Sequence, residues 1–258
     1  MGPKQFTEKI IVATSQFIRN DLTRDLFLSL ESDGVPFTSL VLFDGTPKEK
    51  ISLQNVDIAI IVEKPIHSMP EIFNIIFNLA KSTDAEFIMF CDNDIKFKKG
   101  SFQRLSVLTK SYDVISPLKI DKDLEKFKSY FSTEAPVEVI GSNDSVWFFR
   151  LNKIPWSPED RIGPFGFEDV IINYKLWRNG ATFVVDPKAV VFHHGSQETS
   201  DCFLPADRER YSGEWDSKRD RFLKDNGSEG KWFFDNVIMN QEGIKRFGYP
   251  VFVLEKEG

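Results

Sequence analysis

Residues 87–97 read FIMFCDNDIKF, and this stretch decides how the rest of the chain is interpreted. Its first five residues are apolar, as expected for a strand of a parallel sheet that is covered on both faces. The strand runs directly into Asp92, Asn93 and Asp94. In open α/β sheets, ligands bind beyond the carboxyl ends of the strands. The two carboxylates therefore stand where a ligand is expected.

Short apolar segments alternate with amphipathic helical patterns on both sides of this stretch. We expect strands at 9–14, 37–46, 56–63, 85–90 and 112–118, and helices near 20–34, at 69–83 and from about residue 101. This alternation predicts an α/β fold of the doubly wound type, with a mostly parallel central sheet.

The second half of the chain is less regular. Residues 137–151 read as two strand pieces around a Gly-Ser-Asn turn, and 168–180 as a helix after a loop rich in Pro and Gly. Residues 181–196 read as a strand, or as a hairpin turned by Asp186-Pro187. We therefore expect a small antiparallel portion. A single domain over 1–227 and a C-terminal extension over 228–258 that packs on it complete the prediction.

The composition of the chain limits which classes of protein it can belong to. The chain has 258 residues and a net charge of −6, which gives no overall electrostatic footprint for binding a nucleic-acid backbone, although a local basic patch stays possible. Cys91 and Cys202 fit neither a zinc site nor a disulfide framework. No apolar run approaches the ~18 residues of a membrane span. We expect a soluble, cytoplasmic protein of unknown oligomeric state.

Asp92 and Asp94 are separated by one residue, so in an extended segment both carboxylates project to the same side. Holding two like charges at a buried strand end is costly unless a cation compensates. Mg²⁺ and Mn²⁺ prefer oxygen ligands and often complete their shell with phosphate oxygens. The pair predicts a metal that docks a diphosphate; the alternative is a solvated Asp-Asn-Asp turn.

Two further motifs carry polar groups. Glu168 and Asp169 open the predicted helix at 168–180, where the helix dipole stabilises acidic residues and where a general base is also well placed. His193 and His194 end an apolar run. Consecutive strand residues point to opposite faces, so at most one of these imidazoles faces the carboxylates, where it can complete a metal shell.

The order of these pieces resembles a known family. A strand ending in Asp-x-Asp, a later helix opening in Glu-Asp and a strand ending in His-x-Gly-Ser are similar to the GT-A glycosyltransferases, most closely to the family-two branch, whose members use nucleotide-sugar donors and invert the sugar. The resemblance runs from Lys9 to about Gly227 and includes the FLKDNG segment at 222–227. It implies a nucleotide-sugar half to about residue 120 and an acceptor half over 121–227.

The resemblance also implies the cofactors and the donor-side roles. It implies Mn²⁺ or Mg²⁺ and a nucleotide-diphosphate sugar. The implied metal ligands are Asp94, Asp92 and His193, and the implied donor contacts are Thr14, Asp44, Asp92 and Asn93. The family usually carries Asn-Arg after its first strand, whereas this chain reads TSQFIRND at 14–21, so the contacts there depart from the pattern.

On the acceptor side the resemblance implies that Asp169 deprotonates the acceptor hydroxyl and that Glu168 orients the acceptor. The implied acceptor is a glycan or another hydroxyl compound, or alternatively a hydroxymethylated base of viral DNA, with the host cytoplasm as location.

Two other functions stay open: a nucleotidyltransferase or pyrophosphorylase, and a non-catalytic nucleotide-sugar-binding module. The former is expected to carry a Gly-rich phosphate loop after the first strand, and residues 14–21 contain no glycine.

Two groups of side chains have both a structural and a functional interpretation. The first is a set of aromatic residues that can line a sugar platform or belong to the core, and core is favoured: Trp147, Trp156, Phe165 and Phe167. The second is a set of cations within 206–225 that can reach a diphosphate or a polyanionic acceptor, or lie on a solvated helix, which is favoured: Arg208, Arg210, Lys218, Arg219 and Arg221.

Overall fold

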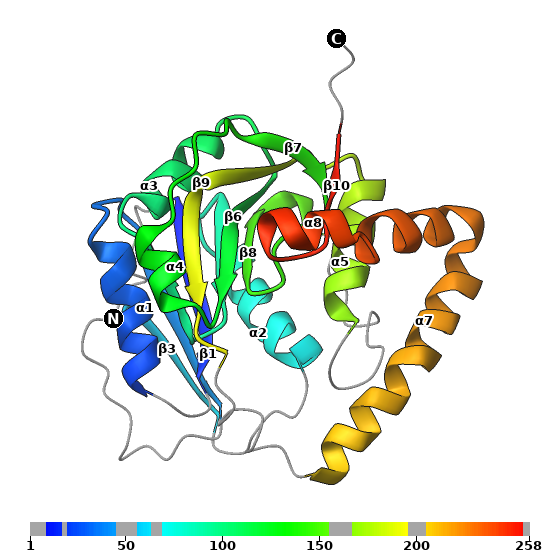
Figure 1. The fold of residues 1–258 in the computed structure, drawn as a ribbon. Coiled ribbons are helices and arrows are strands. Elements are labelled where there is room, and N and C mark those ends of the chain that lie inside the picture. Colours follow the sequence, from blue (N-terminus) through cyan, green and yellow to red (C-terminus); the bar gives the residue numbers. More distant parts are fainter. Residues whose placement is uncertain are drawn as a thin grey trace.

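The computed structural model describes residues 9–16, 20–44, 56–62, 69–154, 167–195 and 205–254, with the backbone alone for 20, 44, 70 and 205–214. The described strands form one sheet in the order β10-β7-β9-β6-β8-β4-β1-β2-β3, and β5 pairs with β9 beside this path (Figure 1).

The first half of the sheet is parallel. It consists of β1 (Ile10–Gln16), β2 (Thr38–Asp44), β3 (Ile58–Val62) and β4 (Phe87–Cys91), hydrogen-bonded in the order β3-β2-β1-β4. All five residues of β4 are buried, as its unbroken apolar sequence predicts. The carboxyl ends of these parallel strands lie at one edge of the sheet, and the Asp92–Asp94 turn that follows β4 lies at that edge.

The second half of the sheet is mixed. Its strands are β5 (Ile95–Phe97), β6 (Val114–Asp121), β7 (Val137–Ile140), β8 (Val146–Arg150), β9 (Phe183–His193) and β10 (Phe252–Val253). β6 and β9 pair in parallel, whereas β8 pairs antiparallel with both β4 and β6, and β7 is antiparallel to β9. The predicted fold class, a mixed α/β fold with a parallel sheet and an antiparallel portion, is confirmed.

Residues 183–193 form one strand, so the alternative of a hairpin at Asp186-Pro187 was wrong. The pairing of β6 with β9 instead shifts register there: Pro117 lies opposite Asp186, and the next pair joins Leu118 to Val190. Beyond this irregularity the two strands pair again, and β6 therefore runs to Asp121 rather than ending at the predicted residue 118.

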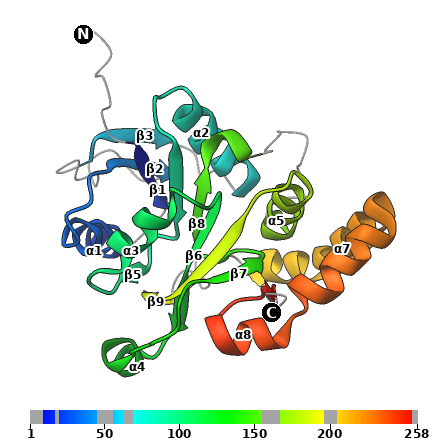
Figure 2. The same cartoon turned by 90° about the horizontal axis from the view of Figure 1, so that it is seen from above.

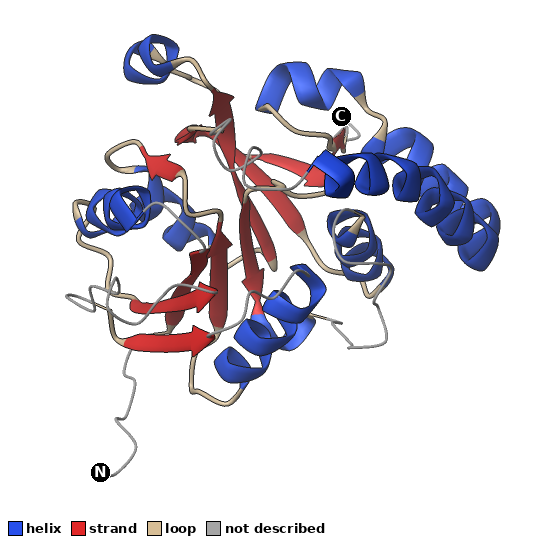
Figure 3. Cartoon of the chain, turned by 90° about the horizontal axis from the view of Figure 1, so that it is seen from below, coloured by secondary structure: helices blue, strands red, loops and turns tan. Residues whose placement is uncertain are grey.

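Helices cover both faces of the sheet (Figures 2 and 3). One face is covered by α1 (Asn20–Glu31) and α3 (Ser101–Leu108), whose apolar residues share a buried cluster with the strands. The other is covered by α2 (Met69–Lys81) and α5 (Glu168–Arg178). α4 (Leu124–Ser129) and the 3₁₀ helix η2 (Leu151–Lys153) are short connecting elements. None of the described helices combines the length and the apolar character needed to cross a bilayer.

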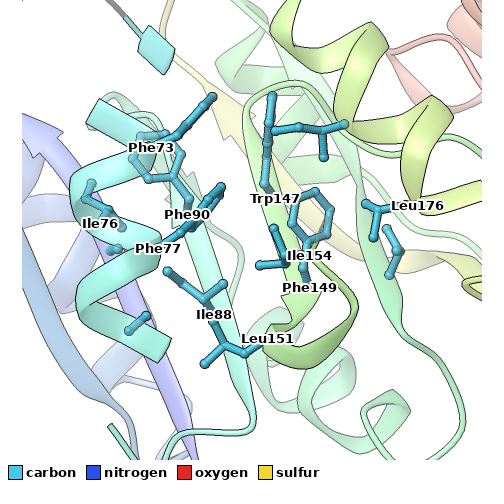
Figure 4. Close-up of a cluster of buried hydrophobic side chains, with 14 of the residues drawn as sticks. Phe73, Ile76, Phe77, Ile88, Phe90, Trp147, Phe149, Leu151, Ile154 and Leu176 are labelled. Carbon is cyan, nitrogen blue, oxygen red and sulfur yellow. The ribbon is translucent and has the colours of Figure 1, made fainter. Parts of the chain in front are cut away.

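Aromatic packing fixes the position of β4 (Figure 4). Phe73 of α2 meets Phe90 of β4 edge-on at 4.9 Å between ring centroids and lies 4.7 Å from Trp147 of β8. Burying a phenyl ring stabilises the fold by about 1.5–3 kcal/mol, so these contacts hold β4 and β8 firmly under α2. Trp147 and Phe167 belong to the core, as favoured from the sequence; residues 156 and 165 lie outside the described part of the chain.

The C-terminal segment wraps over α5. α7 (Pro205–Phe233) leaves helical geometry at Gly227, and it is followed by the π-helix η4 (Phe234–Ile238) and by α8 (Gln241–Phe247). Phe222, Phe233 and Phe234 share a buried cluster with α5. In Figures 1 and 2, α5 lies between the sheet and α7. The division into a domain over 1–227 and an extension over 228–258 stays a prediction.

Candidate active site

The candidate site begins where β4 ends. The chain turns over Asp92, Asn93 and Asp94 and returns as β5. The backbone N–H of Asp92 donates to the Ser145 carbonyl at 3.0 Å, and the N–H of Ile95 donates to the Asp92 carbonyl at 3.3 Å. These bonds fix the turn, and its three polar side chains are half-buried at the carboxyl edge of the parallel strands.

Strand pairing brings a histidine to this turn. β5 is antiparallel to β9 with Ile95 opposite His193, and the N–H of His194 donates to the Asp94 carbonyl at 3.0 Å. The His193 Nε2 atom consequently lies 3.5 Å from Asp94 Oδ1. Asp92, Asp94 and His193 each offer one ligand atom, and these three atoms lie within 4.8 Å of one another. His193 is half-buried, whereas His194 is exposed and does not belong to this cluster.

The other nitrogen of the same imidazole is held by Asp121. Because β6 and β9 pair in parallel with Asp121 opposite His193, Asp121 Oδ1 lies 2.7 Å from His193 Nδ1. A carboxylate on one ring nitrogen fixes the tautomer and the orientation of a metal-ligating histidine. Asp121 was not predicted from the sequence, because the strand was expected to end three residues earlier.

The residues of this cluster fit a divalent cation. Two carboxylates and an imidazole form a ligand set that suits Mn²⁺, and carboxylates alone suit Mg²⁺. Burial and then the charge of Asp94 raise the pKa of Asp92 to about 7. A cation between the two carboxylates would offset both effects, since it favours the ionised form of each.

A second charged pair lies beside the cluster. Lys119 of β6 is buried, with its Nζ 2.6 Å from Asp144 Oδ1 and 4.0 Å from Asp121 Oδ2. Asp144 belongs to the loop between β7 and β8, which Asn143 shapes by accepting from the N–H groups of Ser145 and Val146. The sequence pattern missed both members of this pair, although a lysine between the apolar residues Leu118 and Ile120 was a usable signal.

Glu168 and Asp169 occupy the first turn of α5 and are half-buried. Burial and then the charge of Asp169 raise the pKa of Glu168 to about 7. Burial and then the charge of Asp144 raise the pKa of Asp169 to about 6. The Glu168 Oε2 atom is buried without a hydrogen-bond partner among the described residues. Both carboxylates are therefore in an environment that favours uptake of a proton or a hydrogen-bond donor.

The loop that carries Asp144 also contacts α5. The Ser142 hydroxyl donates to Asn173 Oδ1 at 2.8 Å, and the Asn173 amide donates to the Asp169 carbonyl at 2.9 Å. The charge of Asp144 acts on both Asp92 and Asp169, and the charge of Asp92 acts on Glu168. The turn after β4 and the start of α5 therefore form one continuous acidic site, although Asp94 and Glu168 are separated by 73 residues in the sequence.

The remaining candidate residues lie at the same edge. Thr14 of β1 pairs in register with Cys91, the residue before Asp92, and its hydroxyl is buried without a hydrogen-bond partner among the described residues. Asp44 ends β2, where its backbone alone is described. Asn93 is half-buried in the turn itself. The structure thus brings the predicted donor-side residues to one edge, and their roles stay predictions.

No model of a known protein family and no curated protein sequence matches this chain. Solved structures do match. The Staphylococcus aureus protein TarS superposes with a TM-score of 0.54 at 14% identity, over 73% of this chain and 37% of TarS. GalNAc-T7, solved with UDP, GalNAc and Mn²⁺, superposes with a TM-score of 0.56 at 12% identity, over 72% of this chain and 44% of its own.

A shorter form of TarS, residues 1–349 in complex with UDP-GlcNAc, matches with a TM-score of 0.53 at 14% identity, over 76% of this chain and 62% of that one. The chain described here thus spans less than half the length of the first two matching proteins. Both are glycosyltransferases, and the two matches cover 73% and 72% of this chain. The chain has the GT-A glycosyltransferase fold.

Proposed function

We propose that this protein is a metal-dependent glycosyltransferase that moves a sugar from a nucleotide-diphosphate donor to an acceptor hydroxyl with inversion. The observation that carries the proposal is that two clusters of acidic side chains lie next to each other at the carboxyl edge of the sheet. One group, Asp92, Asp94 and His193, offers three ligand atoms that lie within 4.8 Å of one another. The other, Glu168 and Asp169, has pKa values raised toward neutrality.

On the donor side, Asp92, Asp94 and His193 would hold Mn²⁺ or Mg²⁺, which when bound acts as a Lewis acid toward the departing diphosphate. Asp121 keeps the ring of His193 oriented toward Asp94. Thr14, together with Asp44 and Asn93, would contact the nucleoside. The similar structures of TarS and GalNAc-T7 contain UDP-GlcNAc and UDP respectively, which makes UDP the first nucleotide to test.

On the acceptor side, Asp169 would take the proton of the attacking hydroxyl. Its pKa of about 6 leaves it ionised at neutral pH while keeping it more basic than an ordinary aspartate, which suits a general base. Glu168 would accept a hydrogen bond from the same acceptor. A single base opposite the leaving diphosphate gives one displacement and therefore inversion. The two flanking carboxyls of glycosidases, one of which acts as an acid, are a different arrangement.

The net charge of −6 favours a glycan or another hydroxyl compound as acceptor over modified DNA, because phosphate contacts need a basic face. The Glu168–Asp169 pair favours transfer over the alternative of a non-catalytic binding module, since binding a nucleotide sugar needs no base.

Calorimetry with UDP, GDP, CDP and TDP, each with and without Mn²⁺, tests the donor site. We expect one nucleotide to bind in a metal-dependent manner to the wild type and to the control Asp84→Ala, in which an exposed carboxylate is removed. Asp94→Ala should abolish that binding. Equal binding by Asp94→Ala, or no metal-dependent binding of any nucleotide by the wild type, would contradict the proposal.

A further inference from the structure

α7 packs over the first turn of α5 at the point where the acidic pair begins. Phe167, the residue before Glu168, makes edge-on contacts with Trp215 and Phe222 of α7, each at 5.6 Å between ring centroids. Lys218 follows Trp215 by three residues and precedes Phe222 by four. Residues three and four apart share one face of a helix. Lys218 therefore lies on the face of α7 that contacts the start of α5.

Burial separates Lys218 from the neighbouring cations of the helix. Lys218 is 4% exposed. Arg219 forms an ion pair with Asp220 at 2.9 Å, and Arg221 lies 3.6 Å from Asp225, in pairs between partly or largely exposed side chains. These two arginines thus belong to a solvated helix face, as favoured from the sequence. Lys218 does not belong to that solvated face, because it is buried. The side chains of residues 208 and 210 lie outside the described part of the chain.

A buried ammonium group is costly unless it faces an anion. The charges that act on Glu168 come from three elements: Asp169 on α5 itself, Asp92 beyond β4, and Lys218 on α7. Lys218 is the positive one of the three, and it favours the ionised carboxylate, whereas the two aspartates oppose it. The Oε2 atom of Glu168 is buried and has no hydrogen-bond partner among the described residues, so it is available to a ligand.

We propose that Lys218 is a positioning residue on the acceptor side of the site: its ammonium group is the electrostatic partner of Glu168 and holds that carboxylate ready to receive the acceptor hydroxyl. This inference rests on the proposed function, in which Asp169 deprotonates that hydroxyl. It assigns α7 a role in the site, because the helix brings a charge to it as well as the aromatic side chains that pack on Phe167.

The backbone at Phe167 supports this view of α7. Phe167 has φ 75°, a left-handed conformation that is rare for a bulky side chain and that persists only where the surroundings enforce it. Phe167 also stacks on Phe234, the first residue of the π-helix that follows α7. The same C-terminal segment that carries Lys218 therefore holds the turn from which Glu168 and Asp169 project.

The test is a direct titration of Glu168. Carboxyl ¹³C shifts are followed by NMR against pH in the metal-free protein, with the signal assigned by its loss in Glu168→Gln. The variant Lys218→Met should raise the pKa of Glu168 by about one unit, the lower end of the effect of a nearby opposite charge. Lys218→Arg should restore the wild-type value. Lys224→Met, which removes an exposed lysine of the same helix, should leave it unchanged.

A second readout separates this inference from the proposed function. UDP binding with Mn²⁺, measured by calorimetry, should be the same in Lys218→Met and in the wild type, because Lys218 faces the acceptor side. An unchanged pKa of Glu168 in folded Lys218→Met, or a loss of UDP affinity in that variant alone, would overturn the inference. A raised pKa in a protein whose wild type shows no metal-dependent binding of UDP, GDP, CDP or TDP would support the Lys218–Glu168 pair and refute the proposed function.

Discussion

Replacing Asp169 by Asn should stabilise the protein while removing its activity. Burial and Asp144 raise the pKa of Asp169 from 3.8 to about 6, a rise of about two units. Since one unit corresponds to 1.36 kcal/mol, ionising this carboxyl in the folded protein costs up to about 3 kcal/mol more than in the unfolded chain. Asn has the same shape and can still accept the backbone N–H bonds, but it carries no charge.

The sign of the effect depends on pH. Below about pH 4 the wild-type carboxyl is protonated in both the folded and the unfolded state, so Asp169→Asn should change the free energy of unfolding little. Between about pH 4 and 6 the folded protein holds the proton more tightly, so the wild type loses stability as pH rises and the variant does not. Above pH 6 the difference should level off at up to about 3 kcal/mol in favour of the variant.

Urea unfolding at pH 4 and pH 7.5, without metal, measures this difference, and Asp84→Asn serves as the control for an exposed carboxylate. Sugar transfer by Asp169→Asn should fall by about 10²–10⁴-fold, the usual contribution of a general base. A stability difference that is the same at both pH values would refute the assignment of a destabilised charge at Asp169. Near-normal turnover would refute its role as the base.

Two further predictions concern the charges around the site. Asp121→Asn should weaken Mn²⁺ affinity by about 10–100-fold, because His193 loses its anionic partner; calorimetric titration with Mn²⁺ measures this, and an unchanged affinity would contradict the orienting role. Asp144→Asn should lower the pKa of Asp169 and Lys119→Met should raise it, because their charges act on Asp169 with opposite signs. Carboxyl ¹³C titration measures both shifts, and shifts in the same direction would refute this electrostatic picture.

The sequence predicted the strands and helices that have a long periodic pattern. The unbroken apolar run before Asp92 and the 3.6-residue spacing of α2 each admit one structure, and both were predicted within a few residues. β5 was missed because three residues are too short for a period to be recognised. The end of β6 was placed too early, at residue 118, because the pairing that resumes there and runs to Asp121 depends on β9.

The same distinction applies to the candidate site. Asp92, Asp94, Glu168 and His193 stand at the ends of predicted elements, where a pattern of apolar residues stops at a polar one. Asp121, the partner of His193, does not stand at the end of a predicted element. Asp121 faces His193 only because of the register between β6 and β9, whose first paired residues, Val114 and Phe183, are 69 positions apart in the sequence. Such pairings are set by tertiary structure, which the spacing of residues along the chain does not encode.

The hydrogen bond that joins Tyr249 to β6 has a consequence for synthesis of the chain. The buried Tyr249 hydroxyl donates to the carbonyl of Pro117 at 2.6 Å, at the place where β6 and β9 change register. β6 therefore reaches its final surroundings only after about 130 more residues have been made. During translation the parallel half of the sheet, whose strands all lie before residue 92, can form well before the mixed half is complete. A ribosome-bound chain should accordingly complete β1 to β4 before it contains His193, the third residue of the Asp92–Asp94–His193 cluster.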